Sequence, residues 1–361
     1  MPTVMLTAKC VNSCEWCFAR AKMAEYRSRG ISEMGLGDFT SVVDFYASSG
    51  IGNLILLGGE PLLHSRFMDV LELLRSRRFS ASVSTTGICP KTLVDRIGAG
   101  RFPALKFLLN STSYFDYSPP KRQRVDYFLR HIGHPVVLGY TITERDLDQR
   151  NPYAVVDRIG LVMKFSLVSH LQFQIAVPGK GNSRYIPLHR YPDLMDLLQS
   201  WFGILRKNRV SYGVDCHSIP RCAMPADAEG AGMFRSTCDR FMIDIGPGLE
   251  AWPCFPLSDH AVALDHFSDF NEAHSYFHRG MQDTTPRYEG GCTGCTERKK
   301  NACDGGCLGF QNLRPETRIP CRPDDGVSGK RRNNGMMEQR EIDTPENWNG
   351  ESSREKRIYT G

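Results

Sequence analysis

The sequence has no long hydrophobic run and no strong excess of charge of either sign. No stretch of about 18 apolar residues exists that could form a transmembrane helix. The first residues, Met-Pro-Thr-Val-Met-Leu, lack the basic and long apolar segments of a signal peptide. The formal net charge of +5 over 361 residues gives no clear signal for nucleic-acid or membrane binding. We therefore expect a cytoplasmic protein without a membrane partner.

Cysteine is absent from the middle of the chain and frequent on both sides of it. None of the 13 cysteines falls between Cys89 and Cys216. An odd number excludes complete disulfide pairing, and cytoplasmic thiols are more often metal ligands than disulfides. Hydrophobic residues make up 41% of the chain, as is ordinary for a globular protein with a large core. We therefore expect a folded chain in which the cysteines bind metal.

Short apolar runs alternate with helix-like segments over about the first 210 residues. Near-continuous apolar strands separated by helices indicate parallel strands that helices cover. Six such units are too few for a closed eight-stranded barrel. We predict an α/β fold, an open, partial (β/α)6 barrel, over residues 1–210. The predicted strands cover 3–6, 53–57, 80–84, 104–110, 135–141 and 171–177, and the predicted helices 38–49, 66–77, 90–97, 152–166 and 191–207.

The first cysteine group directly follows the first predicted strand. Cys10, Cys14 and Cys17 have the spacing Cys-x3-Cys-x2-Cys. A structural zinc ion takes four protein ligands, and an iron–sulfur cube takes one cysteine for each iron. Three ligands leave one metal position open, which suits catalysis better than a structural role. A zinc knuckle with a distant fourth ligand is the alternative.

Glycines and polar residues follow other predicted strands at their carboxyl ends, where α/β folds bind ligands. After the second strand, two glycines permit close backbone approach, and a carboxylate and carbonyls can accept hydrogen bonds from an ammonium group. An ordinary turn is the alternative there. For Thr85 the alternative is a capped turn, and for Val177 it is core packing. The candidates are Gly58, Gly59, Glu60, Pro61, Ser84, Thr85, Asn110, Ser111 and Val177.

The three-cysteine loop and the Gly-Gly-Glu-Pro motif resemble those of the radical S-adenosylmethionine (SAM) superfamily, whose fold is a partial barrel. The resemblance implies a [4Fe–4S] cluster held by Cys10, Cys14 and Cys17, with SAM chelated to the iron that lacks a protein ligand. In this family an electron from the cluster breaks the sulfonium C–S bond of SAM. The resulting 5′-deoxyadenosyl radical takes a hydrogen atom from the substrate.

The same resemblance implies further contacts to SAM. Trp16, directly before the third cysteine, takes the place of an aromatic residue that lies near the adenine. Residues 58–61 take the place of the motif that binds the amino group of SAM. Ser84 and Thr85 take the place of polar contacts to its carboxylate or ribose. Asn110 is expected to line the same cavity, and Val177 to pack on the adenine.

The composition changes after about residue 210. Apolar periodicity fades, glycine and proline become frequent, and cysteines come densely, as in a small domain that metal holds together. The spacing Cys-x2-Cys-x7-Cys-x3-Cys within this group is strong evidence for metal binding, with two structural zinc sites as the alternative. The cysteines are Cys216, Cys222, Cys238, Cys254, Cys292, Cys295, Cys303, Cys307 and Cys321.

This second group resembles the SPASM domain, a C-terminal extension of some radical SAM enzymes that carries two auxiliary [4Fe–4S] clusters. Two spacings are longer than in that family, from Gly248 to Cys254 and from Cys295 to Cys303. Phe255 stands where sulfatase-maturing members carry a carboxylate base. The resemblance implies one cluster on Cys238, Cys254 and Cys307 with Cys216 or Cys222, and another on Cys292, Cys295, Cys303 and Cys321.

The domain organisation follows from this change. We predict a SPASM-type domain over residues 211–321. The remaining residues, 322–361, are polar, with balanced charge and no apolar period, and we expect a disordered tail there.

The combined resemblance implies an oxidoreductase of the radical SAM/SPASM type. Auxiliary clusters suit oxidation because a substrate radical must lose a second electron. We expect cross-linking or desaturation of a ribosomally made peptide, with dehydrogenation or epimerisation of a small-molecule metabolite as the alternative. A non-catalytic zinc protein is the third alternative. Epimerisation would need a hydrogen donor, and Cys89, outside both cysteine groups, is expected to be a buried, inert thiol.

The expected partners follow from this chemistry. They are an electron donor such as flavodoxin or ferredoxin, the substrate, and a separate peptide-recognition protein, since no recognition domain precedes the barrel in this sequence.

Overall fold

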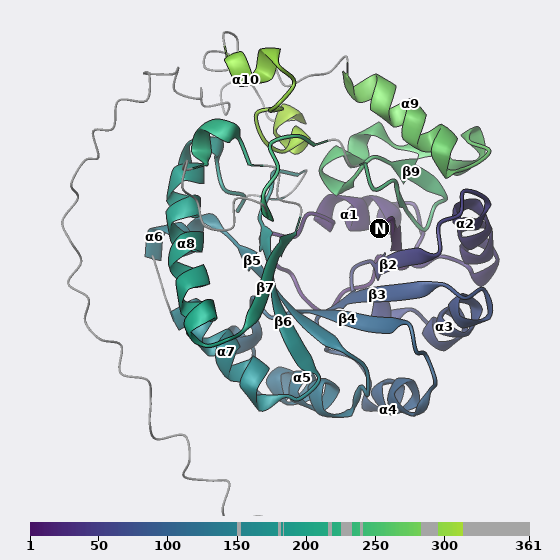
Figure 1. Cartoon of the computed structure of the whole chain (residues 1–361). Helices are drawn as coiled ribbons and strands as arrows, with labels where there is room; N and C mark the ends of the chain where they lie inside the picture. Colours follow the sequence, from purple (N-terminus) through teal and green to yellow (C-terminus); the bar gives the residue numbers. More distant parts are fainter. Residues whose placement is uncertain are drawn as a thin grey trace, which may run out of the picture. The chain divides into compact units, whose positions relative to one another are not determined.

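A ten-stranded, mostly parallel sheet runs through the part of the chain that the structure describes (Figure 1). The structure is a computed structural model. It describes residues 1–149, 153–179, 182, 184–215, 219–224, 233–238, 241–282 and 295–312. All of these belong to one compact unit, Met1–Pro323. Cys216, Cys292, Cys321 and the tail predicted at 322–361 lie outside the described residues.

The strand order is β10-β9-β8-β1-β2-β3-β4-β5-β6-β7. β1 to β7 are parallel neighbours in chain order, and β8 adds to the other side of β1, also in parallel. β9 runs antiparallel to both of its neighbours, β8 and β10. The predicted α/β fold with a parallel sheet is confirmed. The strands are β1 (Thr3–Met5), β2 (Asn53–Leu57), β3 (Ser80–Thr85), β4 (Leu105–Asn110), β5 (Val136–Ile142), β6 (Val168–Ile175), β7 (Ser211–Asp215), β8 (Asp244–Ile245), β9 (Glu250–Trp252) and β10 (Val262–Ala263).

The helices lie around the outside of the sheet in Figure 1. The α-helices are α1 (Arg20–Ser28), α2 (Leu36–Ser48), α3 (Phe67–Ser76), α4 (Lys91–Ala99), α5 (Pro119–His131), α6 (Glu144–Gln149), α7 (Tyr153–Lys164), α8 (Tyr191–Lys207), α9 (Phe270–Gln282) and α10 (Thr296–Lys299). Short 3-10 helices are η1 (Pro61–Leu63), η2 (Tyr114–Asp116), η3 (Leu188–Arg190), η4 (Arg221–Ala223), η6 (Phe255–His260), η7 (Leu264–His266) and η8 (Leu308–Asn312). Among the described helices, none is long and apolar enough to cross a membrane. The cytoplasmic location stays a prediction.

Six strands and five helices lie within a few residues of their predicted positions. The sequence patterns did not predict other elements, among them β7 and α5, and the reason can be seen in their residues. β7 has the sequence Ser-Tyr-Gly-Val-Asp, in which only Val214 is buried, so it contains no apolar run. α5 begins with two prolines, and only Val125, Phe128 and Leu129 of its residues are buried. Its apolar stripe is too narrow to give a clear helical period.

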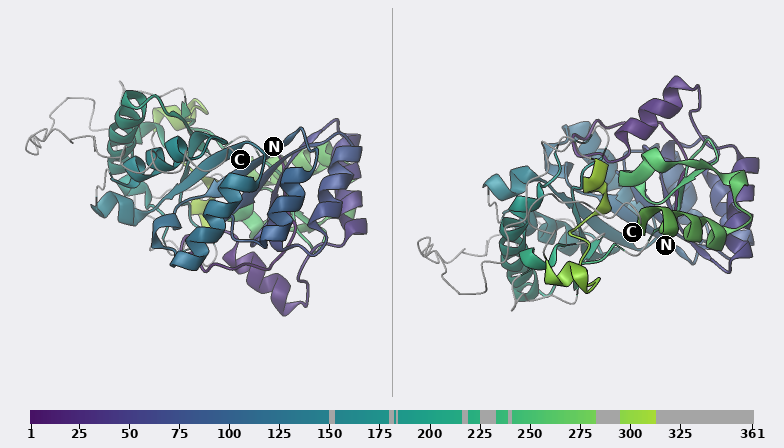
Figure 2. Two further views of the ribbon diagram at one scale, coloured as in Figure 1. Left: turned by 90° about the horizontal axis from the view of Figure 1, so that it is seen from below. Right: turned by 90° about the horizontal axis from the view of Figure 1, so that it is seen from above.

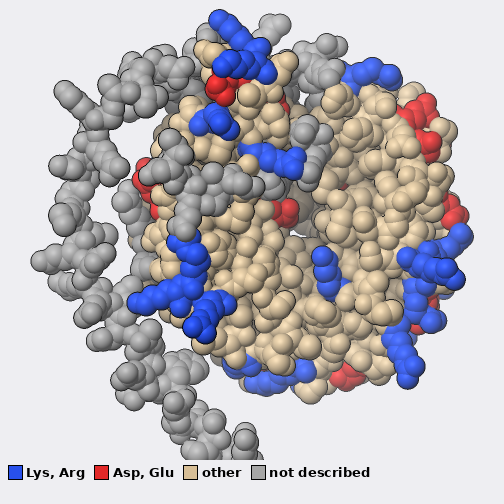
Figure 3. All heavy atoms as spheres, viewed as in Figure 1, with Lys and Arg blue, Asp and Glu red and all other residues tan. Residues whose placement is uncertain are grey.

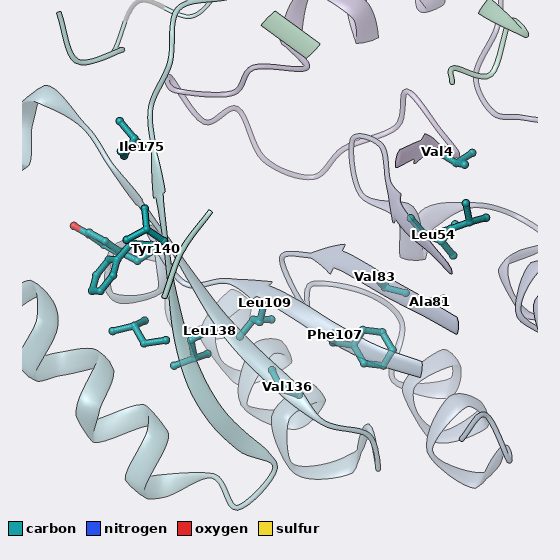
Figure 4. Packing of buried hydrophobic residues seen from close by; sticks show 14 of the residues in the cluster. Val4, Leu54, Ala81, Val83, Phe107, Leu109, Val136, Leu138, Tyr140 and Ile175 are labelled. Carbon is teal, nitrogen blue, oxygen red and sulfur yellow. The ribbon is translucent and has the colours of Figure 1, made fainter. Parts of the chain in front are cut away.

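The two faces of the sheet differ in chemistry because successive strand residues point to opposite sides. On the helix side, β3 contributes Ala81 and Val83 to the large core, and β4 contributes Phe107 and Leu109 (Figure 4). The alternate residues of β3, β4 and β6 point to the other face. Leu108 of β4 lies on this face together with partly exposed polar residues, which are Ser82, Ser84, Asn110, Gln172 and Gln174. The surface seen in Figure 3 is hollowed near its centre, with basic and acidic residues scattered around the rim.

A smaller core joins α1 to the β8–β9 hairpin. Tyr26 of α1 is fully buried and donates a hydrogen bond to Glu250 Oε2 (2.7 Å), and Arg29 pairs with the same carboxylate. Farther along, α9 lies beside α2 and β9 (Figures 1 and 2). The sheet thus contains strands from both sides of residue 210, while the predicted domain boundary there stays a prediction. The smaller core comprises Met5, Ala8, Ala19, Met23, Tyr26, Leu57, Trp252 and Phe255.

β8 carries a buried carboxyl group next to β1. Asp244 is 4% exposed, and its Oδ1 has no hydrogen-bond partner among the described residues. Burial raises the pKa of Asp244 from 3.8 to about 7, although Thr3, the Phe255 amide and the N-terminal amine oppose the shift. A neutral acid is therefore the form that the fold accommodates best.

We expect this carboxyl to make stability depend on pH. Because its pKa is higher in the folded than in the unfolded chain, the folded state holds the proton more tightly between about pH 4 and pH 7. The corresponding stability, on the order of 4 kcal/mol, is lost as the pH rises through that window. Asp244→Asn should remove this loss. Urea unfolding of metal-free protein at pH 5 and pH 8 measures it.

The test compares the unfolding free energies of Asp244→Asn and wild type at each pH. Relative to wild type, the variant should be more stable at pH 8 than it is at pH 5. An equal difference at both values would show that Asp244 does not gain a proton on folding.

Candidate functional site

The loop after β1 carries Cys10, Cys14 and Cys17 and leads into α1. The amide of Cys17 donates to the carbonyl of Cys14 (3.2 Å), and Arg20 donates to the carbonyls of Ser13 (3.0 Å) and Cys14. The thiols are partly exposed and lie close enough together to influence one another electrostatically. Burial, and then the charges of Cys17 and Cys10, raise the pKa of Cys14 to about 11. The loop therefore brings the three predicted thiols together.

The Gly-Gly-Glu segment after β2 packs directly against this loop. The amide of Gly59 donates to the carbonyl of Thr7 (2.7 Å), and the amide of Glu60 donates to the carbonyl of Lys9 (2.7 Å). A Cβ atom on Gly59 would lie 2.1 Å from the Lys9 carbonyl oxygen and 2.8 Å from Cys10 Cβ. On Gly58 it would lie 2.6 Å from the Thr7 carbonyl oxygen. Only glycine permits this approach of two backbones.

Glu60 is buried beneath the loop and connects the end of β2 to the end of β3. Its Oε1 accepts hydrogen bonds from Thr85 Oγ1 (2.6 Å) and the Leu62 amide (3.3 Å). Its Oε2 accepts from the amide (2.8 Å) and Oγ1 (2.5 Å) of Thr86. Burial raises the pKa of Glu60, and these hydrogen bonds oppose the shift. Both oxygens are thus engaged within the protein, and the contact of this side chain with SAM stays a prediction.

The other predicted residues lie at several places around the carboxyl ends of the strands. Trp16 is partly buried, and its Nε1 has no partner among the described residues. Ser84 and Asn110 face the side away from the helices, and Asn110 Oδ1 accepts from the Thr112 amide (3.1 Å). Val177 packs against the large core. The structure thus joins the cysteine loop to residues 58–61 and Thr85, and its placement of Val177 agrees with the core-packing alternative.

A polar contact that the sequence did not reveal covers the cysteine loop. Asn12 Nδ2 donates to the hydroxyl of Tyr117 (2.8 Å), and Lys121 Nζ donates to Asn12 Oδ1 (3.1 Å) and the Val11 carbonyl (3.4 Å). The partners are 105 to 110 residues apart in the chain. No local spacing could have indicated them.

The second cysteine group is described in part. The Arg221 amide, next to Cys222, donates to Cys303 Sγ (3.3 Å), and the Cys238 amide donates to Asp304 Oδ2 (2.6 Å). The turns that carry Cys222, Cys238 and Cys303 therefore lie together. Gly309 packs against both Cys307 and Pro256. A Cβ atom added to Gly309 would lie 3.4 Å from Cys307 Sγ and 2.6 Å from Pro256 Cβ. This places Cys307 near the turn that follows Cys254.

Phe255, next to Cys254, approaches the first cysteine loop. Its ring centre is 4.9 Å from that of Phe18, which follows Cys17, and 5.5 Å from that of Trp252. Phe255, which the sequence places where sulfatase-maturing members carry a carboxylate, thus makes an apolar contact. Among the described residues, no three His, Cys, Asp or Glu side chains are positioned as ligands of one metal ion. The ligand sets predicted for the auxiliary clusters stay predictions.

Comparison with known proteins identifies the part of the chain that holds the first loop. Residues 4–126 match the model of the radical SAM superfamily. This segment is a radical SAM domain. The chain is also similar to SuiB from Streptococcus suis, solved with S-adenosylmethionine, with 13% identity and a TM-score of 0.63 over 87% of this chain and 74% of SuiB. SuiB bound to precursor peptide SuiA gives 12% identity and a TM-score of 0.60 over 85% and 71%.

At these identities the similarity to SuiB concerns the fold alone. Among curated proteins, none matches the sequence. The radical SAM domain implies an enzyme with a [4Fe–4S] cluster and SAM. The thiols of Cys10, Cys14 and Cys17 are not positioned as ligands of one metal ion in this structure, but in residue type they suit such a cofactor pair, because thiolates are soft ligands for iron. Beside them lies Trp16, whose buried Nε1 donor has no partner among the described residues. The SPASM resemblance stays a prediction.

The close packing at Gly59 predicts a sharp effect of one added methyl group. In Gly59→Ala the new Cβ must displace backbone at Lys9 and Cys10, which should destabilise the fold by about 1–3 kcal/mol and distort the loop. Gly52→Ala is the matched control, since a Cβ there meets nothing within 4 Å. Urea unfolding and iron content after anaerobic reconstitution are the measurements. Equal values for both variants would contradict the role of this contact.

Proposed function

We propose that this protein cleaves SAM reductively and abstracts a hydrogen atom from a substrate, with Cys10, Cys14 and Cys17 as cluster ligands. The observation that carries the proposal is the packing of the three-thiol loop on Gly58, Gly59 and Glu60. Two backbone hydrogen bonds of 2.7 Å join these segments at the carboxyl ends of β1 and β2. Parallel α/β sheets bind their ligands at this edge. The radical SAM domain covers both segments.

The residues of the site supply position rather than acid–base chemistry. When bound, the cluster and SAM supply the radical chemistry. The thiols would hold the cluster, and the absence of side chains at Gly58 and Gly59 lets the backbone of the cysteine loop pack directly on the end of β2. Trp16 offers an indole N–H, and Ser84 and Asn110 offer polar groups on the face away from the helices. Glu60 and Thr85 fix the ends of β2 and β3 against each other (2.6 Å).

For the second cysteine group we propose two auxiliary [4Fe–4S] clusters, as in a SPASM domain. The turns of Cys222, Cys238 and Cys303 lie together, and Cys307 lies near the turn after Cys254. Such clusters would accept the second electron of an oxidation. Phe255 in place of a carboxylate favours an oxidation that needs no base at that position. An external donor such as flavodoxin or ferredoxin would reduce the first cluster.

We propose a ribosomally made peptide as the substrate, with cross-linking or desaturation as the outcome. The support is the fold shared with SuiB, which has been solved with a precursor peptide. The polar strand face, with Ser82, Gln172 and Gln174, offers hydrogen bonds to a peptide backbone. A hydroxylated metabolite would use the same groups, so the substrate class requires an experiment.

The first test concerns SAM cleavage. Anaerobically reconstituted protein with SAM and dithionite should form 5′-deoxyadenosine, and Cys14→Ala and Cys17→Ala should lower its formation to the level without enzyme. Cys89→Ala is the matched control, because this thiol is only 3% exposed and lies outside both cysteine groups. It should retain the rate within about twofold. Chromatography of the nucleoside products measures this. Cleavage by the Cys14 or Cys17 variants would refute the ligand assignment, and zinc without sulfide would refute the cluster.

The second test concerns the substrate. A short peptide encoded beside the gene, incubated with the enzyme, SAM and dithionite, should lose two hydrogen atoms for each cross-link or double bond. Mass spectrometry measures the loss, which should be accompanied by 5′-deoxyadenosine. SAM cleavage that is stimulated by a small metabolite and leaves every such peptide unchanged would favour the metabolite alternative.

A further inference from the structure

The segment between β4 and α5 reaches across the site and holds the middle of the cysteine loop. Asn12 is the central residue between Cys10 and Cys14. Its Nδ2 donates to Tyr117 Oη (2.8 Å), and its Oδ1 accepts from Lys121 Nζ (3.1 Å). Both ends of the Asn12 side-chain amide are therefore engaged, one by this connection and the other by Lys121 of α5, which fixes the orientation of the amide.

This connection is itself firmly held. Arg158 of α7 is 5% exposed and donates to the carbonyls of Ser111 (3.0 Å) and Thr112 (2.9 Å), where β4 ends. Arg122 of α5 donates to the carbonyl of Tyr117 (3.4 Å). A side chain whose backbone is fixed in this way can position a neighbour without first becoming ordered itself. Tyr117 thus belongs to a rigid support, although it is far from the loop in sequence.

The loop residue that Tyr117 contacts is coupled to a predicted cluster ligand. The backbone amide of Asn12 donates to Cys10 Sγ (3.5 Å). The Tyr117 hydroxyl is also close enough to Cys14, Cys10 and Glu60 to experience their charges. A displacement of Asn12 would therefore change the hydrogen bonding of Cys10 and the distance between the thiols of Cys10 and Cys14.

We propose that Tyr117 is a positioning residue of the site, and that through its hydrogen bond with Asn12 it fixes the loop from Cys10 to Cys14 in the shape that SAM cleavage requires. The inference rests on the proposed function. It concerns a residue outside the cysteine and glycine motifs, contributed by the connection between β4 and α5. Tyr117 acts on the ligands of the cluster and takes no part in the chemistry itself.

The test is a double-mutant cycle on the reconstituted holoenzyme. Tyr117→Phe and Asn12→Ala should each lower the rate of 5′-deoxyadenosine formation about three- to tenfold, as expected for one lost hydrogen bond. The double variant should be no slower than Asn12→Ala alone, because both changes remove the same contact. Each single variant should also alter the EPR signal of the reduced cluster with SAM bound. Tyr127→Phe is the control: its hydroxyl bonds Asp95 (2.6 Å) away from the loop, and its rate should match wild type.

A second readout does not depend on the cluster. In metal-free protein, hydrogen exchange of the peptide that spans residues 9–19 should be faster in Tyr117→Phe and Asn12→Ala than in wild type or Tyr127→Phe. If wild type forms no 5′-deoxyadenosine, the proposed function fails, and exchange alone decides whether Tyr117 orders the loop. Unchanged exchange would overturn the inference. Faster exchange with unchanged cleavage and EPR would overturn the positioning role, and additive losses in the cycle would overturn the route through Asn12.

Discussion

The close approach of two backbone segments, residues 7–10 and residues 58–60, is the constraint on which the rest of the site depends. Two hydrogen bonds of 2.7 Å join them, and no side chain stands between them because Gly58 and Gly59 have none. The three-thiol loop starts from this contact. Its position relative to β2 is therefore set by backbone geometry, which is stiffer than a contact between flexible side chains.

From this contact a series of buried polar groups leads around the ends of the strands. Glu60 accepts hydrogen bonds from Thr85 and Thr86 and so ties β2 to β3. Arg158 donates to the carbonyls that end β4. Burying a charge is costly unless several hydrogen bonds compensate it, and both of these groups have several. The helix side of the same sheet is apolar, and its burial provides most of the stability. The residues of the candidate site lie instead at the ends of the strands.

The part of the chain after residue 210 adds to the sheet rather than lying apart from it. β7 pairs with β6, and β8 pairs with β1. The hairpin that follows β8 packs on α1 through Tyr26 and Glu250. Phe255 meets Phe18, so the residues next to Cys254 and Cys17 are in contact. Any electron acceptor held near Cys254 would therefore lie beside the first cysteine loop, an arrangement that suits an oxidation in two one-electron steps.

The sequence by itself determined the elements whose signal is local. Continuous apolar runs marked six parallel strands, a clear 3.6-residue period marked α8 within its observed bounds, and the spacing of Cys10, Cys14 and Cys17 marked the loop. Only the tertiary structure decided that the Glu60 carboxylate points inward to Thr85, and that Tyr117 reaches Asn12. The reason is physical: periodicity and spacing report what a residue does within its own segment. A hydrogen bond between residues 105 positions apart exists only once the strands have brought their ends together.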